Sequence, residues 1–349
     1  MSLLFNVRLV KCIKRILPVV KHILINYNNR PIMFSNSKQS ILNSVQNISL
    51  LKNPNATKSI IFGFSLLGLF GLDDKNESER KLIYTIKRGL LYLQDNNYNA
   101  FEHTLHDALK IATDLNHFNG ITYVYDILAN GALTNKDYDK AKVLFIKVVQ
   151  RLYQQGGVDE DLNIVHVNLK IAKILEIQKD YNSSRLGFEF CLNILKKKYE
   201  IDPENEDVLG LYSLTLDAYA RHLMNQGNNT HACTYFKKAF DISVKLNGEL
   251  NEINVILLND LGTMYYVRGM LEEALYFFGK AEKIGKHFPD METFSTIYVN
   301  LGNIFLKQGL LKEAEKHCVE GMKNAKRHHY EIGKTEAANC LADIKKAME

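Results

Sequence analysis

From about residue 80 to the C-terminus, apolar and small residues recur in a fixed order that predicts pairs of antiparallel helices. In the clearest unit this order is Leu258, Leu261, Gly262, Tyr265, Gly269, Ala274, Phe278 and Ala281. The first four share one face of a helix, and the last three share one face of a second helix that begins after Gly269. Gly262 and Ala274 are small where the two helices should approach, and Phe278 should pack between them. Each position therefore has a mechanical reason.

The same order fits five more units, with varying quality. The position of Ala274 is taken in turn by Phe101, Ala141, Ser184, Ala232 and Ala314, at intervals of 40 to 48 residues. A tetratricopeptide repeat (TPR) is a helix pair of ~34 residues with this pattern. We therefore predict an all-α TPR solenoid over residues 80–349, a right-handed superhelix of about six helix pairs. Longer helices and longer joints should account for the residues beyond this length, and Pro203 and Pro289 should lie in the joints. Residues 331–348 should form a C-terminal capping helix.

The charge distribution separates an N-terminal segment from this body. Residues 1–72 contain nine Lys and Arg and no Asp or Glu, so the remaining 35 basic and 39 acidic residues give the body a net charge of −4. Residues 1–58 are also rich in Asn and Ser, and Leu9, Ile13, Ile16 and Val20 form an apolar helical stripe. These features predict a mostly disordered mitochondrial transit peptide, the alternative being a disordered basic tail. The acidic body argues against nucleic acid as a partner.

Residues 59–72 (SIIFGFSLLGLFGL) are fourteen uncharged residues. As a helix they would measure ~21 Å, which is short of the ~30 Å hydrocarbon core of a bilayer. We expect a short membrane-associating segment that skims the membrane surface. The alternatives are docking on the body or loss on processing and, third, a full span with local thinning of the bilayer.

Residues that could carry chemistry do not assemble into a site in the sequence. The five cysteines have no zinc spacing, and so sparse a set predicts no disulfide framework and a reducing compartment such as the mitochondrial matrix. Cys191 and Cys318 occupy repeat packing positions, which predicts core filling. His103 and His106 lack a third ligand, and His328 and His329 are expected in a solvated turn. We therefore expect no enzyme activity, metal, cofactor or small-molecule substrate.

The inner groove of a TPR superhelix should be lined by polar residues of the first helices. The candidates for a peptide-binding groove are Asn130, Lys173, Arg221, Asn259 and Asn303. Asparagine can bond a peptide backbone, and Lys173 with Arg221 can meet acidic groups. Reversing both charges should then weaken partner capture and leave helicity intact. The alternative is that Asp126 and Asp217 simply neutralise Lys173 and Arg221.

Four strings that the TPR pattern does not require carry a family resemblance: FGFSLLGLFG at 62–71, LHDAL at 105–109, ITYVYD at 121–126 and GFEFC at 187–191. They resemble the tetratricopeptide repeat protein 19 family of animal mitochondria. The resemblance implies a scaffold on the matrix side of the mitochondrial inner membrane that associates with respiratory complex III. It further implies support of that complex by allowing fragments of the Rieske iron–sulfur protein to be cleared.

Two function classes remain as alternatives. An extramitochondrial cargo or polarity adaptor would resemble motor light chains, which have TPRs of ~42 residues. The absence of acidic residues from positions 1–72 argues against this alternative, and imaging of the tagged protein would distinguish a mitochondrial from an extramitochondrial location. The second alternative is an enzyme, which would need a pocket that contains titratable groups with shifted pKa values.

Overall fold

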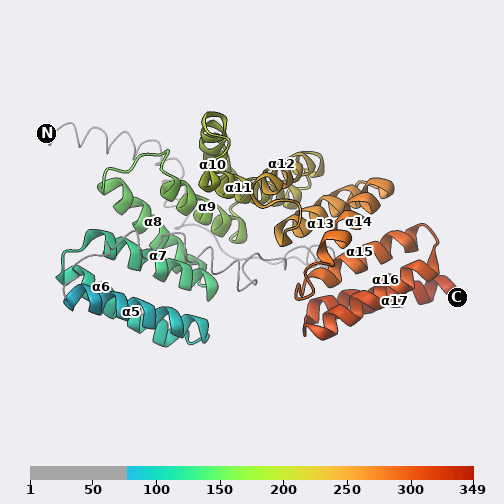
Figure 1. Cartoon of the computed structure of the whole chain (residues 1–349), viewed down its shortest axis with the longest axis horizontal. Helices are drawn as coiled ribbons and strands as arrows, with labels where there is room; N and C mark the ends of the chain where they lie inside the picture. The colour runs from blue at the N-terminus through green and yellow to red at the C-terminus, as the bar shows by residue number, and fades with distance from the viewer. Residues whose placement is uncertain (1–76) are drawn as a thin grey trace, which may run out of the picture. The chain divides into compact units, whose positions relative to one another are not determined.

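The computed structural model describes residues 77–349, which form thirteen helices and no strand (Figure 1). The predicted all-α TPR fold with a capping helix is confirmed for this part of the chain. The described residues divide into two compact units, 77–187 and 188–349, with the division inside one helix. The predictions for residues 1–58 and 59–72 lie outside the described residues.

The first unit consists of α5 (Glu77–Gln94), α6 (Tyr98–Asp114), α7 (Phe118–Thr134), α8 (Tyr138–Gln154), α9 (Leu162–Ile177) and the start of α10 (Tyr181–Ile201). Its core contains Phe101 and Phe145, both fully buried. Phe101 is a large residue at a position where other repeats have a small one. The structure accommodates it opposite Gly131 of α7, because a Cβ atom at Gly131 would overlap the Phe101 ring. In this first repeat the large residue therefore lies on the second helix, α6, and the small residue that makes room for it lies on α7.

The second unit contains the rest of α10 and seven further helices. These are α11 (Glu206–Asn225), α12 (Asn229–Asn247), α13 (Glu252–Val267), α14 (Leu271–Gly285), α15 (Phe294–Lys307), α16 (Leu311–Arg327) and α17 (Glu331–Met348). Pro203 and Pro289 lie in the joints before α11 and α15, as predicted. The long helices predicted from the repeat interval are also present, since α10 has 21 residues and α11 has 20.

Within the second unit, phenylalanines fill the space that small residues leave. Phe236 and Phe278 are buried, and a Cβ atom at Gly262 would lie 2.7 Å from two ring atoms of Phe278. Such a distance is too short for real carbon atoms, so α13 and α14 approach this closely only because residue 262 is glycine. Leu258, Leu261, Ala274 and Ala281 are buried around the same contact, and Tyr265 is partly buried.

Each helix pair turns through one residue in the left-handed region. In the later repeats it is a glycine, such as Gly269 (φ +77°) and Gly309 (φ +76°), whereas α7 and α8 are joined through Lys136 (φ +63°). Glycine is the usual residue here because it has no Cβ atom to clash with the backbone.

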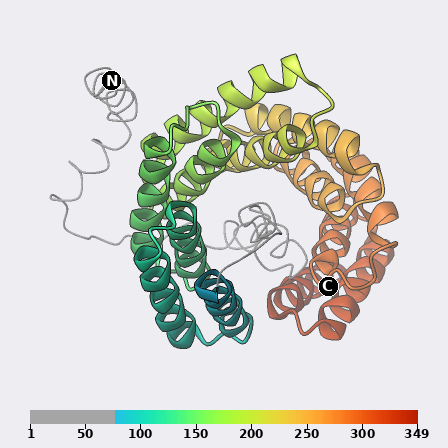
Figure 2. The same ribbon diagram turned by 60° about the vertical axis from the view of Figure 1, so that its left-hand side comes forward.

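The capping helix α17 packs on α16, and the two run side by side at the C-terminal end of the chain (Figure 2). Cys318 of α16 and Cys340 of α17 form a disulfide. The expectation that the cysteines form no disulfide, and that Cys318 is merely a core-filling thiol, is therefore wrong for this pair. The prediction did not take into account that the capping helix brings a second cysteine, Cys340, to the packing position of the last repeat. Cys191 and Cys233 are buried and lie outside any disulfide.

Candidate partner-binding face

The candidate groove residues lie on the first helices of the repeats: Asn130 on α7, Lys173 on α9, Arg221 on α11, Asn259 on α13 and Asn303 on α15. Asn130 and Lys173 belong to the first unit and the other three to the second. Since each residue is at most partly exposed, its neighbours decide what it can bind.

In the first unit, Asn130 is bonded within its own helix. Its side-chain amide donates to the backbone carbonyl of Asp126 (2.7 Å) and to Asp126 Oδ2 (3.0 Å). The other carboxylate oxygen of Asp126 lies 3.6 Å from Nζ of Lys170 on α9, and both side chains are buried. Asp126 therefore pairs with Lys170, one turn before the predicted residue Lys173.

Lys173 is half-buried in α9 and contributes to an electropositive environment around His166. Burial first, then Lys170 and Lys173, lower the pKa of His166 to about 3. His166 is therefore neutral at physiological pH, and this part of α9 carries its positive charge on the two lysines.

In the second unit, Arg221 lies between two carboxylates. Its Nε donates to Oδ1 of Asp217 (3.1 Å) on the same helix, and its Nη2 pairs with Asp260 on α13. Burial raises the pKa of Asp260 to about 6, and Arg221 opposes that rise. Burial alone would lower the pKa of Arg221, but the two carboxylates together raise it above its ordinary value. Arg221 therefore stays charged and holds α11 to α13.

The next link in the second unit is neutral. Nδ2 of Asn300 on α15 donates to Oδ1 of Asn259 on α13 (2.9 Å). One repeat later, the hydroxyl of Thr296 on α15 donates to Glu336 of α17 (3.1 Å). Asn303 is half-buried, directly after the small position Gly302.

These contacts form a polar ladder, defined here as the side-chain pairs Asp126–Lys170, Arg221–Asp260, Asn259–Asn300 and Thr296–Glu336. Each pair joins the first helix of a repeat to the helix one repeat later, or to the cap. Sequence reasoning named one partner of three pairs but missed Lys170, Asp260 and Asn300. The signal was available, because the paired residues are 39 to 44 positions apart, about one repeat.

The ladder changes what the sequence-based binding test would measure. Reversing the charge of Arg221 would place three carboxylates together in a buried site, which is strongly destabilising. The double reversal of Lys173 and Arg221 therefore cannot be expected to leave the fold intact. Asp217 and Arg221 neutralise each other on the same helix, as the alternative interpretation of the sequence expects for this pair.

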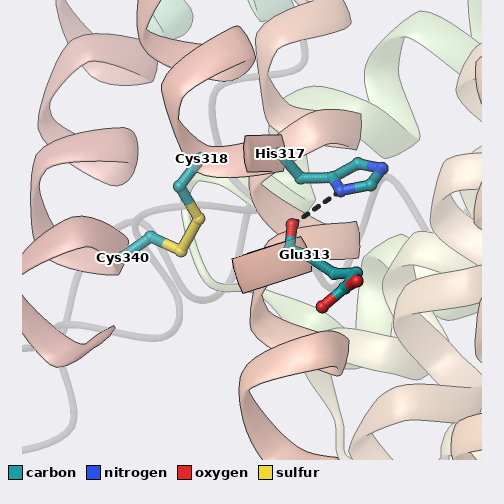
Figure 3. Close-up of a disulfide and its surroundings, with 4 residues drawn as sticks. All are labelled: Glu313, His317, Cys318 and Cys340. Atoms are coloured by element: carbon teal, nitrogen blue, oxygen red, sulfur yellow. Dashed lines mark hydrogen bonds between the residues drawn. A yellow bond between two sulfur atoms is a disulfide. The ribbon is translucent and has the colours of Figure 1, made fainter. Parts of the chain in front are cut away.

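The C-terminal end presents a different buried group (Figure 3). The bonded cysteines have Cα atoms 6.2 Å apart, and their sulfur atoms lie beneath Gly302, where a Cβ atom would overlap Cys318 Sγ. Next to Cys318, Nδ1 of His317 donates to the backbone carbonyl of Glu313 (2.8 Å). Both cysteines are buried, so the disulfide is part of the core and is closed to substrates.

Over residues 77–349, no group of three or more His, Cys, Asp or Glu side chains is placed to hold a metal ion. In the same part of the chain, every helix is too short or too polar to cross a bilayer. His103 and His106, which the sequence analysis considered as ligands, instead lie 3.5 Å from Asp107 and Glu102 on their own helix.

Comparison with known proteins decides the family. A tetratricopeptide repeat family model matches residues 212–286. The mitochondrial tetratricopeptide repeat protein 19 homolog of Drosophila melanogaster is 35% identical over 291 residues, which cover 83% of this chain and 78% of that protein. This chain belongs to the tetratricopeptide repeat protein 19 family. The mitochondrial member from Homo sapiens is 28% identical over 284 residues, which cover 78% of this chain and 74% of that protein.

Solved structures support the fold alone. The crystal structure of BtubC (BKLC) from P. vanneervenii matches with a TM-score of 0.53 at 16% identity, covering 73% of this chain and 94% of that chain. The STAND protein PH0952 from Pyrococcus horikoshii, which has a tetratricopeptide repeat sensor, matches with a TM-score of 0.55 at 14% identity. This match covers 89% of this chain and 44% of that chain.

Proposed function

We propose that this family member is a non-enzymatic TPR adaptor on the matrix side of the mitochondrial inner membrane. It supports the assembly and integrity of respiratory complex III by allowing fragments of the Rieske protein to be cleared. The observation that carries the proposal is the 35% identity with a relative named mitochondrial, which extends over 83% of the chain.

The packing of the repeats supports an adaptor role. Six helix pairs and a cap account for every helix among residues 77–349. The buried charged groups of the ladder are paired with one another across the helices of each unit, which is the expected use of charge in a scaffold. TPR arrays bind other proteins through the extended surfaces that stacked repeats create.

The leader supports the compartment. Nine basic residues and no acidic residue in positions 1–72 suit import into a negative-inside compartment, and the apolar run 59–72 suits association with its membrane. The Cys318–Cys340 disulfide is compatible with a reducing matrix because both residues are buried, so a reductant meets the bond only after α17 opens.

Affinity purification of the tagged full chain from detergent-solubilised mitochondria tests the proposal. Complex III subunits, including the Rieske protein, should be enriched over other inner-membrane proteins of similar abundance. A cargo or polarity adaptor outside mitochondria predicts the opposite, with cytosolic partners recovered and the tagged chain imaged outside the organelle.

A matched variant makes this purification specific for the scaffold. Gly262→Leu should force α13 away from Phe278 and lower partner recovery, whereas Gly279→Ala, where a Cβ atom meets nothing within 4 Å, should leave recovery unchanged. Equal recovery with wild type, Gly262→Leu and Gly279→Ala would show that partner binding does not depend on the packing of the repeats.

A further inference from the structure

The first helix of the described chain, α5, turns outward a face that other first helices bury. In α7 this face consists of Gly120, Val124, Ile127 and Gly131, all buried. It packs on the preceding helix pair, since a Cβ atom at Gly120 would lie 3.3 Å from Leu82 of α5 and one at Gly131 would overlap Phe101 of α6. The corresponding residues of α5, forty positions earlier, are Arg80, Tyr84, Lys87 and Leu91.

These four residues and the flanking Lys81 and Arg88 are here called the α5 outer face. Tyr84 is 66% exposed and Leu91 is 58% exposed. The four basic residues are exposed or partly exposed around them. Both acidic residues of α5, Glu77 and Glu79, lie in its first turn, where they suit the positive end of the helix dipole. In the described chain, α5 is the terminal helix of its unit (Figures 1 and 2).

The positive charge of the α5 outer face limits which partner can cover it. The chain that precedes α5 is a poor occupant, because residues 1–72 contain nine basic residues and no acid. Two aspartates, Asp73 and Asp74, follow but stand immediately before the helix. A face of four cations around a tyrosine and a leucine instead suits an anionic surface into which apolar side chains can insert.

The short distance along the chain between the apolar run 59–72 and α5 indicates which anionic surface α5 can reach. The apolar run 59–72 ends five residues before Glu77, so α5 begins at most ~18 Å from it. A segment that associates with lipid therefore holds α5 close to the headgroups. Tyrosine and basic side chains are the residues that settle at that depth, with their apolar parts inward and their polar ends in water.

We propose that the α5 outer face docks on anionic phospholipid headgroups and so orients the TPR array on the membrane. This inference rests on the proposed membrane location and extends it to a defined surface of the folded body. Arg80 and Lys87 meet phosphate groups, and Tyr84 and Leu91 enter the boundary between headgroups and acyl chains.

Vesicle binding by the full chain tests the charge requirement. Arg80→Glu with Lys87→Glu should reduce binding to vesicles of phosphatidylcholine with one-fifth anionic phospholipid by ~10-fold or more, since each basic residue adds ~1 kcal/mol near such a surface. The matched control is Lys110→Glu with Lys237→Glu, two exposed lysines on other helices with the same total charge change. Both variants keep the basic leader, so its contribution cancels.

A unique fluorophore tests the docking itself, because the chain contains no tryptophan. The emission of Tyr84→Trp should shift to the blue on adding anionic vesicles and should not shift with pure phosphatidylcholine. Tyr276→Trp on α14, a site of similar exposure (63%), should stay unshifted in both. An unshifted Tyr84→Trp, or equal losses of vesicle binding in both charge variants, would overturn the proposal.

The outcome is separable from that of the proposed function. Recovery of complex III from detergent extracts should be unchanged by Arg80→Glu with Lys87→Glu, because no bilayer remains in that experiment. If wild type fails to recover complex III, the proposed function falls while the vesicle results stand. If the double reversal abolishes recovery and leaves vesicle binding intact, α5 binds an acidic protein and the lipid assignment is wrong.

Discussion

Two consecutive repeats, α13–α14 and α15–α16, share one design and differ in how they fill it. Both have a glycine at the small position of the first helix, Gly262 and Gly302, and a left-handed glycine in the turn. In the first, Phe278 fills the space beneath the glycine. In the second, Cys318 is too small to do so, and Cys340 of the capping helix completes the volume through a disulfide.

At its C-terminal end, the second unit thus replaces one large buried side chain with a capping helix. An interior repeat is covered by the next repeat, whereas the last one has only the cap. A covalent link to α17 compensates for the smaller apolar surface that a single helix brings. The polar ladder also changes along the second unit, from the Arg221–Asp260 ion pair between α11 and α13 to the neutral Asn259–Asn300 contact between α13 and α15.

The largest effect should come from emptying the interior repeat. Phe278→Ala leaves a cavity beneath Gly262 in a site that is 1% exposed, and it should lower the free energy of unfolding by about 3–5 kcal/mol. Urea denaturation followed by circular dichroism measures it. Phe278→Leu, which preserves more of the volume, should cost less than half as much. Equal costs would mean that Phe278 does not fill the space assigned to it.

The disulfide should contribute the next largest effect. Its two cysteines are 22 residues apart, so reduction should lower stability by about 3 kcal/mol. Thermal melts with and without reductant measure this loss. Cys318→Ala with Cys340→Ala should melt near the reduced wild type and ignore reductant, whereas Cys233→Ala should keep the response. Reductant-insensitive melting of purified, oxidised wild type would contradict the account.

The glycines themselves should come next. Gly262→Ala and Gly302→Ala should each cost about 1–3 kcal/mol, because the added methyl group meets Phe278 in one repeat and Cys318 in the other. Gly279→Ala on α14 is the control, with nothing within 4 Å, and it should stabilise by about 0.5–1 kcal/mol through higher helix propensity. A stabilising Gly262→Ala would show that α13 and α14 are less close than described.

The last effect concerns the ladder and depends on pH. Asp260→Asn gives α13 the amide that α15 has at Asn300. Burial raises the pKa of Asp260 to about 6 in the folded protein, against 3.8 for an unperturbed carboxyl. The folded state then binds the proton more tightly, so this contribution to stability is complete below pH 3.8 and is lost as pH rises through 6.

Urea denaturation between pH 4.5 and 7.5 measures this effect. The stability of wild type relative to Asp260→Asn should decrease over that range, and a flat or rising difference would contradict the described environment of Asp260.

His166, in the first unit, should make stability depend on pH with the opposite sign. Its pKa of about 3 means that acidification below pH 6.5 destabilises wild type relative to His166→Leu.

Much of the fold could be predicted from the sequence because its contacts are local. Leu258, Gly262 and Tyr265 lie on one helix, and Phe278 follows on the next, so the repeat pattern alone indicates their packing. The capping helix could be recognised from Ala337, Cys340 and Ile344 by the same periodicity.

The pairing of side chains between repeats could not be predicted in the same way. Whether Asp126 meets Lys170 or Lys173 depends on the rotation of α9 against α7, because the two lysines lie ~60° apart around α9 and no local pattern specifies that rotation. The Cys318–Cys340 bond likewise depends on how the cap is seated. The candidate groove residues lie on the first helices and their role in binding a peptide stays a prediction, while the partners of Asn130, Arg221 and Asn259 came only from the structure.

We propose that this scaffold maintains complex III by letting Rieske fragments be cleared. The most direct measurement is the amount of Rieske-derived fragments bound to complex III in mitochondria that lack this chain. We expect that fragments accumulate, that wild type and Gly279→Ala clear them on re-expression, and that Gly262→Leu does not. Fragment levels that stay the same with and without the chain would contradict it.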